Sequence, residues 1–220
     1  MDKESILELI KEIREKEKKR NFVQTFDLII NLRNIDIKNP EEKIDMFIQL
    51  PHGKGKKNKI CALVDIDLLS EAKDTCDKVI QKNEFPRFKG KRELKKLAKE
   101  YDFFIGEATI MPQIAATFGK VFGPLGKMPN PKAGCVVPPK APLKQICERL
   151  RNTVRLITKN EATIKVPVGN EAMKDEEIAE NIITVYNSIV GKLPQEKANI
   201  KNMLLKLTMG KPYQIKNGKT

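Results

Sequence analysis

The chain has 220 residues, of which 40% are hydrophobic and only 5% are aromatic, so we expect one or two domains with aliphatic cores. Its 42 Lys and Arg residues outnumber its 29 Asp and Glu residues, and the resulting net charge of +13 favours a polyanionic partner, either nucleic acid or an anionic membrane surface. No run approaches the roughly 20 apolar residues that span a bilayer, and the N-terminus lacks the apolar segment of a signal peptide, so we expect a cytoplasmic protein.

The first 50 residues predict one helix and two strands. Apolar residues at positions i, i+3, i+4 and i+7 predict an amphipathic helix at the N-terminus: Ile6, Leu9, Ile10 and Ile13. Residues 21–32 alternate between apolar and polar side chains, as does the segment 44–50, and a turn signal at Asn39-Pro40 lies between them. We therefore expect two antiparallel strands with one face covered and the other free.

The middle of the chain has a different pattern. Residues 59–64 (KICALV) are continuously apolar, which is typical of a strand buried on both faces, and the segments 76–80 and 102–108 have the same character. Helical patterns occur at residues 91–101 and 141–150. Strands that alternate with helices indicate a parallel sheet with helices on both faces.

After about residue 155 the alternating pattern returns. The sequence predicts a strand at 162–169, a helix at 175–190 and a last strand within 199–212, followed by a polar tail that we expect to fray. This order is explained by a β/α domain inserted into a split α+β domain. A single continuous mixed sheet fits the pattern almost as well.

The Gly- and Pro-rich segment 122–134 (FGPLGKMPNPKAG) raises the question of a nucleotide-binding loop. A P-loop requires G-x-x-x-x-G-K-[ST], but Met128 follows the Gly-Lys pair and Val121 stands in place of the first glycine. The glycine spacing does not fit a dinucleotide fingerprint, and the prolines remove amide donors that a phosphate would need. We interpret the segment as a stiff basic surface loop, with Lys120, Lys127 and Lys132.

The sequence offers little for catalysis or metal binding. The four cysteines contain no C-x-x-C pair, which disfavours a zinc site, and we expect them to be reduced, buried thiols: Cys61, Cys76, Cys135 and Cys147. His52 is the only histidine, and a histidine in a lysine-rich turn such as PHGKGKKNK is more often solvated than catalytic. We therefore expect no catalytic residues, no cofactor and no metal.

Three separated motifs resemble those of one family. The segment 122–134, RNFVQTFDL (20–28) and KLTMGKP (206–212) resemble, in the right order, the signature elements of the family of the universal first protein of the large ribosomal subunit. The likeness covers nearly the whole chain, and KRNFVQTFDLIINLRNIDI resembles the archaeal branch of the family. It implies an α/β (α+β) protein of two hinged domains. One is a split α+β sandwich with an antiparallel sheet built from both termini (1–65 with 157–220), and the other is an inserted Rossmann-like three-layer α/β/α domain (66–156).

The resemblance also implies a function. Family members are structural constituents of the large subunit, where they bind the rRNA of the mobile stalk near the tRNA exit site and assist release of deacylated tRNA. Many also bind a mimic of that rRNA in their own mRNA, at the leader or coding start, and repress its translation. The implied partners are therefore large-subunit rRNA, the protein's own mRNA and, indirectly, exit-site tRNA. The resemblance implies a protein that is monomeric when free, with no membrane partner and no enzymatic activity.

Carried over by motif, the RNA-binding residues come from the first helix, the first strand and the last strand: Glu12, Phe22, Thr25, Asn202, Lys206, Thr208, Met209, Gly210 and Lys211. Thr25 offers a hydroxyl that suits the 2′-OH groups of RNA, and Gly210 allows close backbone approach. Met209 supplies soft apolar contact, and the flanking lysines suit phosphates, which position rather than specify. Phe22 fits base stacking and a place in the core equally well. Asn202 stands where a serine is usual in the family.

Two other interpretations stay open: a free RNA-binding regulator or chaperone, and a Rossmann-type nucleotide-dependent enzyme, which would need a phosphate-binding loop that the sequence lacks. A second basic cluster favours a solvated helix face of the inserted domain: Arg87, Lys89, Lys91, Arg92, Lys95, Lys96 and Lys99. The lysines of the PHGKGKKNK turn suit an RNA contact or a solvated turn equally: Lys54, Lys56, Lys57 and Lys59.

Overall fold

The computed structural model describes residues 2–37, 39, 42–88 and 90–215. The chain forms two compact units, of which unit 1 is Met1–Lys56 with Asn152–Thr220 and unit 2 is Lys57–Arg151. These boundaries differ from the predicted 65/66 and 156/157, because β3 (Ile60–Val64) pairs within unit 2 and β7 (Thr153–Ile157) pairs within unit 1. Three features named above lie outside the described residues: Pro40, Lys89 and the tail from residue 216.

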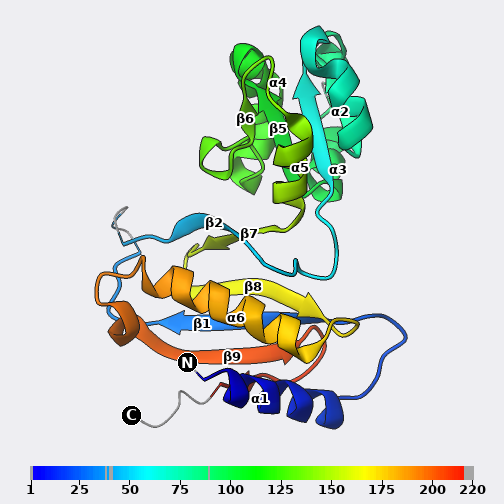
Figure 1. The fold of residues 1–220 in the computed structure, drawn as a ribbon. Helices are drawn as coiled ribbons and strands as arrows, with labels where there is room; N and C mark the ends of the chain where they lie inside the picture. Colours follow the sequence, from blue (N-terminus) through cyan, green and yellow to red (C-terminus); the bar gives the residue numbers. More distant parts are fainter. Residues whose placement is uncertain (1, 38, 40–41, 89, 216–220) are drawn as a thin grey trace. The chain divides into compact units, whose positions relative to one another are not determined.

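Unit 1 contains a four-stranded antiparallel sheet in the order β10-β9-β1-β8. Strand β1 (Thr25–Leu32) pairs with β9 (Ile200–Leu207) along one edge and with β8 (Thr163–Asn170) along the other, and β10 (Tyr213–Gln214) extends the sheet beyond β9. Segments from the two ends of the chain therefore lie side by side in one sheet (Figure 1).

The predicted pairing of the first two strands is wrong. Strand β2 (Asp45–Gln49) pairs with β7 in a separate two-stranded sheet. The physical reason is that both hydrogen-bonding edges of β1 are already taken by β8 and β9, so β2 must find another partner.

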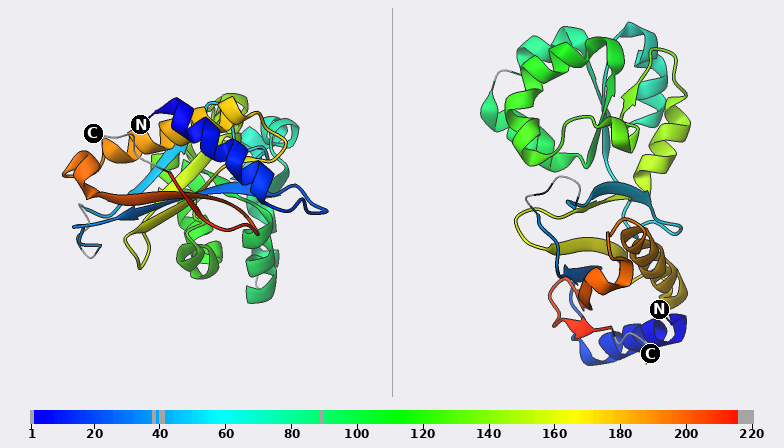
Figure 2. Two further views of the ribbon diagram at one scale, coloured as in Figure 1. Left: turned by 90° about the horizontal axis from the view of Figure 1, so that it is seen from below. Right: turned by 90° about the vertical axis from the view of Figure 1, so that its left-hand side faces the viewer.

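Two helices cover one face of the four-stranded sheet, α1 (Lys3–Lys16) and α6 (Asp175–Val190) (Figures 1 and 2). The predicted alternation of β1 is confirmed, because every second side chain is buried in the core beneath these helices: Phe26, Leu28, Ile30 and Leu32. The two helices contribute buried residues to the same core from the other side: Ile6, Ile10, Ile13, Ile178, Ile182, Val185 and Ile189. Thr25 and Asp27 lie on the opposite, half-buried face of β1.

Unit 2 contains a four-stranded sheet in the order β4-β3-β5-β6, which is parallel as the sequence predicted; the short strand β6 was not predicted. Its other strands are β4 (Lys78–Gln81), β5 (Phe103–Glu107) and β6 (Val136–Val137). β3 is buried along its whole length. The alternative of one continuous mixed sheet is wrong, because the strands of the two units belong to separate sheets.

Helices flank the parallel sheet. α3 (Lys91–Glu100) and α4 (Met111–Leu125) contact each other and share a core with Cys61 and Leu63 of β3. α2 (Leu69–Thr75) and α5 (Leu143–Arg151) also contact each other and β3, whose alternate side chains point to the other face. Short 3₁₀ turns complete the two units: Ile66–Leu68, Lys82–Arg87, Ala108–Ile110, Pro131–Ala133 and Glu196–Asn199.

The segment 122–134 is not the exposed loop that the sequence predicted. Its first four residues end α4, where Phe122 is fully buried, and Gly126 terminates the helix in a left-handed conformation with φ of 65°. Lys127 Nζ donates to the carbonyl oxygens of Tyr101 and Asp102 at 3.0 and 2.9 Å, so this lysine ties the segment to the end of α3. Lys120 and Lys132 are exposed, as predicted.

Among the residues that the structure describes, no helix combines the length and the apolar character needed to cross a membrane.

Candidate nucleic-acid interface

Thr25 and Thr208 meet where β1 begins and β9 ends, although 183 residues separate them in the chain. The Thr208 amide donates to the Thr25 carbonyl at 3.0 Å, and the Thr25 amide donates to Thr208 Oγ1 at 3.1 Å. The same hydroxyl lies 3.3 Å from the Thr25 carbonyl, to which it can donate. The hydroxyl of Thr208 therefore extends the β1–β9 pairing, and its first role is within the protein.

Met209 is exposed, with 61% of its surface accessible, compared with 52% for Phe22. Its amide donates to Gln24 Oε1 at 3.1 Å. Gln24 itself is buried and is held by Glu171, which accepts hydrogen bonds from the Gln24 amide at 2.8 Å and from Gln24 Nε2 at 3.2 Å. The backbone of Met209 is thus fixed while its side chain projects outward.

Gly210 packs against Glu17 rather than leaving an open space. A Cβ atom at this position would lie 2.9–3.1 Å from the Glu17 carboxylate. That carboxylate accepts a hydrogen bond from the Lys211 amide at 2.8 Å, and the Tyr213 hydroxyl lies 3.4 Å from the same oxygen. The glycine therefore admits a protein side chain, and Glu17 holds the segment after β9 against the end of α1.

Phe22 is not a core residue, which resolves the alternative that the sequence left open. It lines a groove of about 690 Å³ in unit 1, together with the exposed Val23 and the basic residues Lys19 and Arg20. Arg14 lies on the same groove, and its guanidinium donates to Asp175 Oδ1 at 2.8 Å, which links α1 to the start of α6. Apolar side chains exposed among cations are typical of surfaces on which RNA bases stack.

Asn202 and Lys206 lie on the half-buried face of the sheet. Asn31 Nδ2 donates to Asn202 Oδ1 at 2.7 Å, and Thr163 Oγ1 donates to Asn31 Oδ1 at 3.0 Å, so three neighbouring strands are linked. Lys206 stands opposite Asp27, whose pKa is raised by burial and lowered less strongly by this lysine. Asn202 is six residues from Thr208, about 20 Å along the strand, so the carried-over residues form an elongated surface rather than a pocket.

Glu12 lies on the exposed side of α1 and forms an ion pair with Lys16 one turn later, both side chains being well exposed. The structure thus brings Phe22, Thr25, Thr208, Met209, Gly210 and Lys211 together at one end of the sheet, and leaves Glu12 and Asn202 further away along α1 and β9.

Sequence reasoning missed three residues of this surface: Glu17, Gln24 and Glu171. Gln24 could have been noticed in the sequence. It lies two positions before Phe26, so the alternation of β1 places this polar side chain on the buried, apolar face. The two glutamates left none, because their partners are backbone amides distant in the chain.

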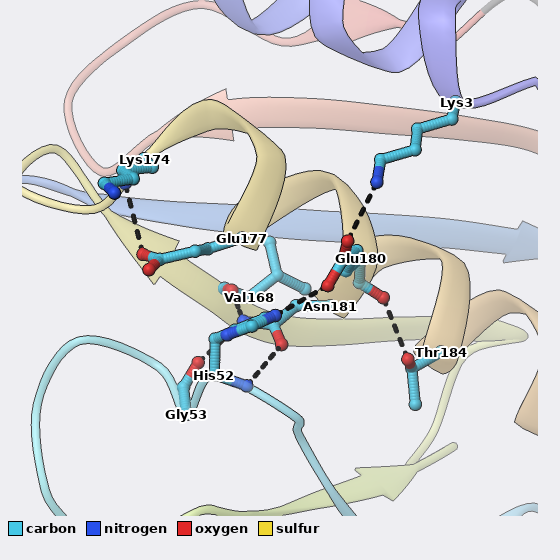
Figure 3. Close-up of polar contacts among 9 residues, drawn as sticks. All are labelled: Lys3, His52, Gly53, Val168, Lys174, Glu177, Glu180, Asn181 and Thr184. Atoms are coloured by element: carbon cyan, nitrogen blue, oxygen red, sulfur yellow. Dashed lines mark hydrogen bonds and ion pairs between the residues drawn. The ribbon is translucent and has the colours of Figure 1, made fainter.

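The lysine-rich turn is anchored within unit 1 by α6 (Figure 3). Asn181 is fully buried, donates to the carbonyls of Gly53 and Val168 at 2.7 and 2.8 Å, and accepts from the His52 amide at 3.2 Å. His52 Nε2 lies 2.6 Å from Glu180 Oε2, and Lys3 Nζ pairs with the other oxygen of Glu180 at 2.8 Å. His52 thus belongs to a structural clamp.

The exposed side of α3 carries lysines and an arginine that face solvent, as the sequence predicted: Lys91, Arg92, Lys95, Lys96 and Lys99. Arg87 lies 3.7 Å from Glu84. Within the described residues, no three His, Cys, Asp or Glu side chains gather into a set that could hold a metal ion.

The net charge of +13 and the exposed apolar and cationic side chains at one end of the sheet are typical of an RNA-binding protein. Residues 13–211 match the ribosomal protein L1p/L10e family, and the chain belongs to that family, whose members are ribosomal proteins and not enzymes.

Curated relatives agree over the whole length. The large ribosomal subunit protein uL1 of Methanothermococcus thermolithotrophicus is 43% identical over 216 residues, covering 98% of this chain and 99% of its own. The proteins of the same name from Pyrococcus abyssi and Methanocaldococcus jannaschii are each 42% identical, and cover 98% and 100% of this chain and 97% and 98% of their own. These relatives are archaeal, as the resemblance of the N-terminal segment indicated.

Proposed function

We propose that this chain is a structural protein of the large ribosomal subunit, and that unit 1 binds the rRNA of the stalk near the tRNA exit site. Family membership and the similarity to large-subunit proteins of archaea support the place in the large subunit. The observation that carries the RNA-binding surface is the group of exposed apolar side chains, Phe22, Val23 and Met209, near the basic residues Lys19 and Lys211.

The proposed roles follow from exposure and hydrogen bonding. Phe22 and Met209 present apolar surface to bases or sugars, because more than half of each residue is accessible. Thr25 presents a hydroxyl to which none of the described residues hydrogen-bonds, and which suits an RNA 2′-OH. Lys206 and Lys211 meet phosphates. Thr208 and Gly210 act through the backbone that they hold in place, and Glu12 and Asn202 extend the surface along α1 and β9.

Filter binding tests this proposal. The intact chain is titrated with a stalk rRNA fragment and with a shuffled RNA of equal length over a series of salt concentrations. Specific short-range contacts leave a large preference for the stalk fragment at high salt, whereas purely electrostatic binding declines for both RNAs alike. Equal affinities that fall together with salt contradict the proposed surface.

Two matched substitutions test whether RNA contacts unit 1 at Met209. Met209→Asp should weaken binding to the stalk fragment by about 1–3 kcal/mol, because it removes apolar contact and adds a negative charge beside phosphates. Leu125→Asp is the control, since Leu125 is an exposed apolar residue of unit 2 with 47% of its surface accessible. Equal losses for both variants would show that the effect is only one of charge.

We propose three further properties of this protein. A segment of the protein's own mRNA with the shape of the stalk rRNA would occupy the same surface and so repress translation. The two units act as hinged domains, which allows the stalk to assist release of deacylated tRNA. Before it joins the ribosome, the free protein is a monomer in the cytoplasm. Competition between the rRNA fragment and the mRNA leader tests the first, and failure to compete rejects a shared surface.

A further inference from the structure

Two cysteines of unit 2 lie in contact. The Sγ atoms of Cys76 and Cys147 are 3.4 Å apart, close enough for either thiol to donate a hydrogen bond to the other. Cys76 directly follows α2, and its amide donates to the Ala72 carbonyl at 2.9 Å, while Cys147 lies in the middle of α5. The two helices, labelled in Figure 1, pack against each other, so the pair joins two elements that are distant in the chain.

The other two cysteines are in a different situation. Cys61 and Cys135 are buried, and burial raises the pKa of their thiols to about 12 and about 11. Cys76 is partly exposed, so a small reagent can reach one member of the contacting pair, whereas Cys147 is 2% exposed. The four cysteines are therefore not equivalent in either access or proximity.

The contact between the two thiols favours a thiolate at Cys147 rather than at Cys76. The Cys76 thiol donates toward Cys147, and this contact lowers the pKa of Cys147 and raises that of Cys76. Burial opposes the lowering at Cys147, the positive charge of Arg151 adds to it, and the negative charge of Asp77 opposes it. Arg151 is held in place because its Nη2 donates to the Thr75 carbonyl at 3.0 Å. Because either sulfur can donate to the other, the thiol of one cysteine stabilises the thiolate of the other when the pair loses a proton.

We propose that Cys76 and Cys147 form a modification site, at which a peroxide oxidises the two thiols to an intramolecular disulfide. In the first step Cys147 Sγ, 3.4 Å away, accepts the proton of Cys76. The Cys76 sulfur attacks one peroxide oxygen, the O–O bond breaks, and Cys76 becomes a sulfenic acid while hydroxide leaves and is protonated to water. In the second step Cys147 Sγ attacks Cys76 Sγ, the S–O bond breaks, and a second water departs. Two thiols and one hydrogen peroxide thus give one disulfide and two waters.

The two sulfur atoms are already close to bonding distance. A disulfide brings the two sulfurs to about 2.05 Å, so from 3.4 Å each sulfur moves by roughly 0.7 Å. The new bond would close a loop that contains β4, α3, β5, α4 and β6, which is most of unit 2. Oxidation is therefore expected to stabilise unit 2 against unfolding and to leave the proposed RNA-binding surface of unit 1 unchanged.

Thiol counting on the intact chain tests the proposal. The reduced protein is treated with hydrogen peroxide, quenched, alkylated and digested, and the cysteine peptides are identified by mass spectrometry. We expect the four free thiols to fall to two, with a monomeric product that has lost the mass of two hydrogen atoms and a linked peptide that contains Cys76 and Cys147. The original count should return on reduction with dithiothreitol.

Single substitutions provide the matched controls. Cys76→Ser and Cys147→Ser should each abolish the linked peptide, whereas Cys61→Ser and Cys135→Ser should retain it. Peroxide should remove two thiols from the wild type for each equivalent consumed and only one from Cys147→Ser, because the Cys76 sulfenic acid of that variant has no neighbouring thiol with which to form a disulfide.

Three results would overturn the proposal: four thiols that survive treatment, a linked peptide that contains Cys61 or Cys135, or cross-linked dimers as the main product. The wild-type peptide map decides the question even if a serine variant fails to fold.

Discussion

Replacing Thr208 with valine tests whether its hydroxyl serves the protein or the RNA. Valine keeps the shape of threonine but removes the oxygen that accepts from the Thr25 amide at 3.1 Å and lies 3.3 Å from the Thr25 carbonyl. A net hydrogen bond is worth about 0.5–1.5 kcal/mol. The longer contact adds little, because the Thr25 carbonyl also accepts from the Thr208 amide, and water can reach this exposed site. We therefore expect a loss of about 1 kcal/mol in the free energy of unfolding.

Urea unfolding measures this loss, and hydrogen exchange at the Thr25 amide should become faster in the same variant. Thr208→Ser is the control, because serine keeps the hydroxyl and should retain both stability and exchange protection. RNA affinity is measured on the same samples. If Thr208→Val keeps wild-type stability and exchange but loses about 1–3 kcal/mol of RNA binding, the hydroxyl contacts RNA directly and the structural role assigned to it is wrong.

Three further changes have defined outcomes. Asn181→Ala should lower the free energy of unfolding by about 2–3 kcal/mol in urea titrations, because it leaves buried carbonyls without donors, and a loss below about 1 kcal/mol would contradict the clamp. Lys3 and His52 lower the pKa of Glu180 to about 2, so its stabilising effect is present above its ordinary pKa of 4.5 and declines as pH falls toward 2. Glu180→Gln should therefore flatten the acid side of the stability–pH curve, and an unchanged curve would refute the linkage. Gly210→Ala should displace the flexible Glu17 carboxylate, costing less than about 1 kcal/mol in stability but speeding exchange of the Lys211 amide.

The sequence predicted those elements whose own pattern determines them. Helix α6 has the predicted bounds of 175–190, and the alternation that begins at Phe26 continues along β1. The partner of β2 could not be predicted, because an alternating strand pairs equally well with any free edge of similar length. Only the structure shows that both edges of β1 are occupied by β8 and β9, which excludes pairing of β2 with β1.

Helix α4 was missed because its last turns contain Gly119, Gly123 and Pro124, which locally favour a loop. The helix nevertheless forms because side chains spaced as on one helical face are buried: Ile114, Phe118, Val121 and Phe122. Tertiary packing outweighed the local propensities.

The candidate site was predicted in part for a similar reason. Motifs located the ends of β1 and β9, but a motif does not reveal which polar atoms are already bonded within the protein. Thr208 and Gly210 were expected to meet RNA directly, yet they contact Thr25 and Glu17. That distinction depends on contacts between residues more than 180 positions apart, which no local pattern encodes.

The position of β1 between β8 and β9 sets an order of events during synthesis. Unit 2 is one continuous segment, so it can fold as soon as Arg151 has left the ribosome that makes it, while β1 has been waiting with both edges unpaired. An unpaired apolar strand invites aggregation until its neighbours arrive. Because Thr208 hydrogen-bonds to the start of β1, a chain that stops short of β9 can have a folded unit 2 but lacks part of the proposed RNA-binding surface. Only copies that include β9 could then bind rRNA and join the ribosome, so the order of the strands would by itself exclude incomplete chains.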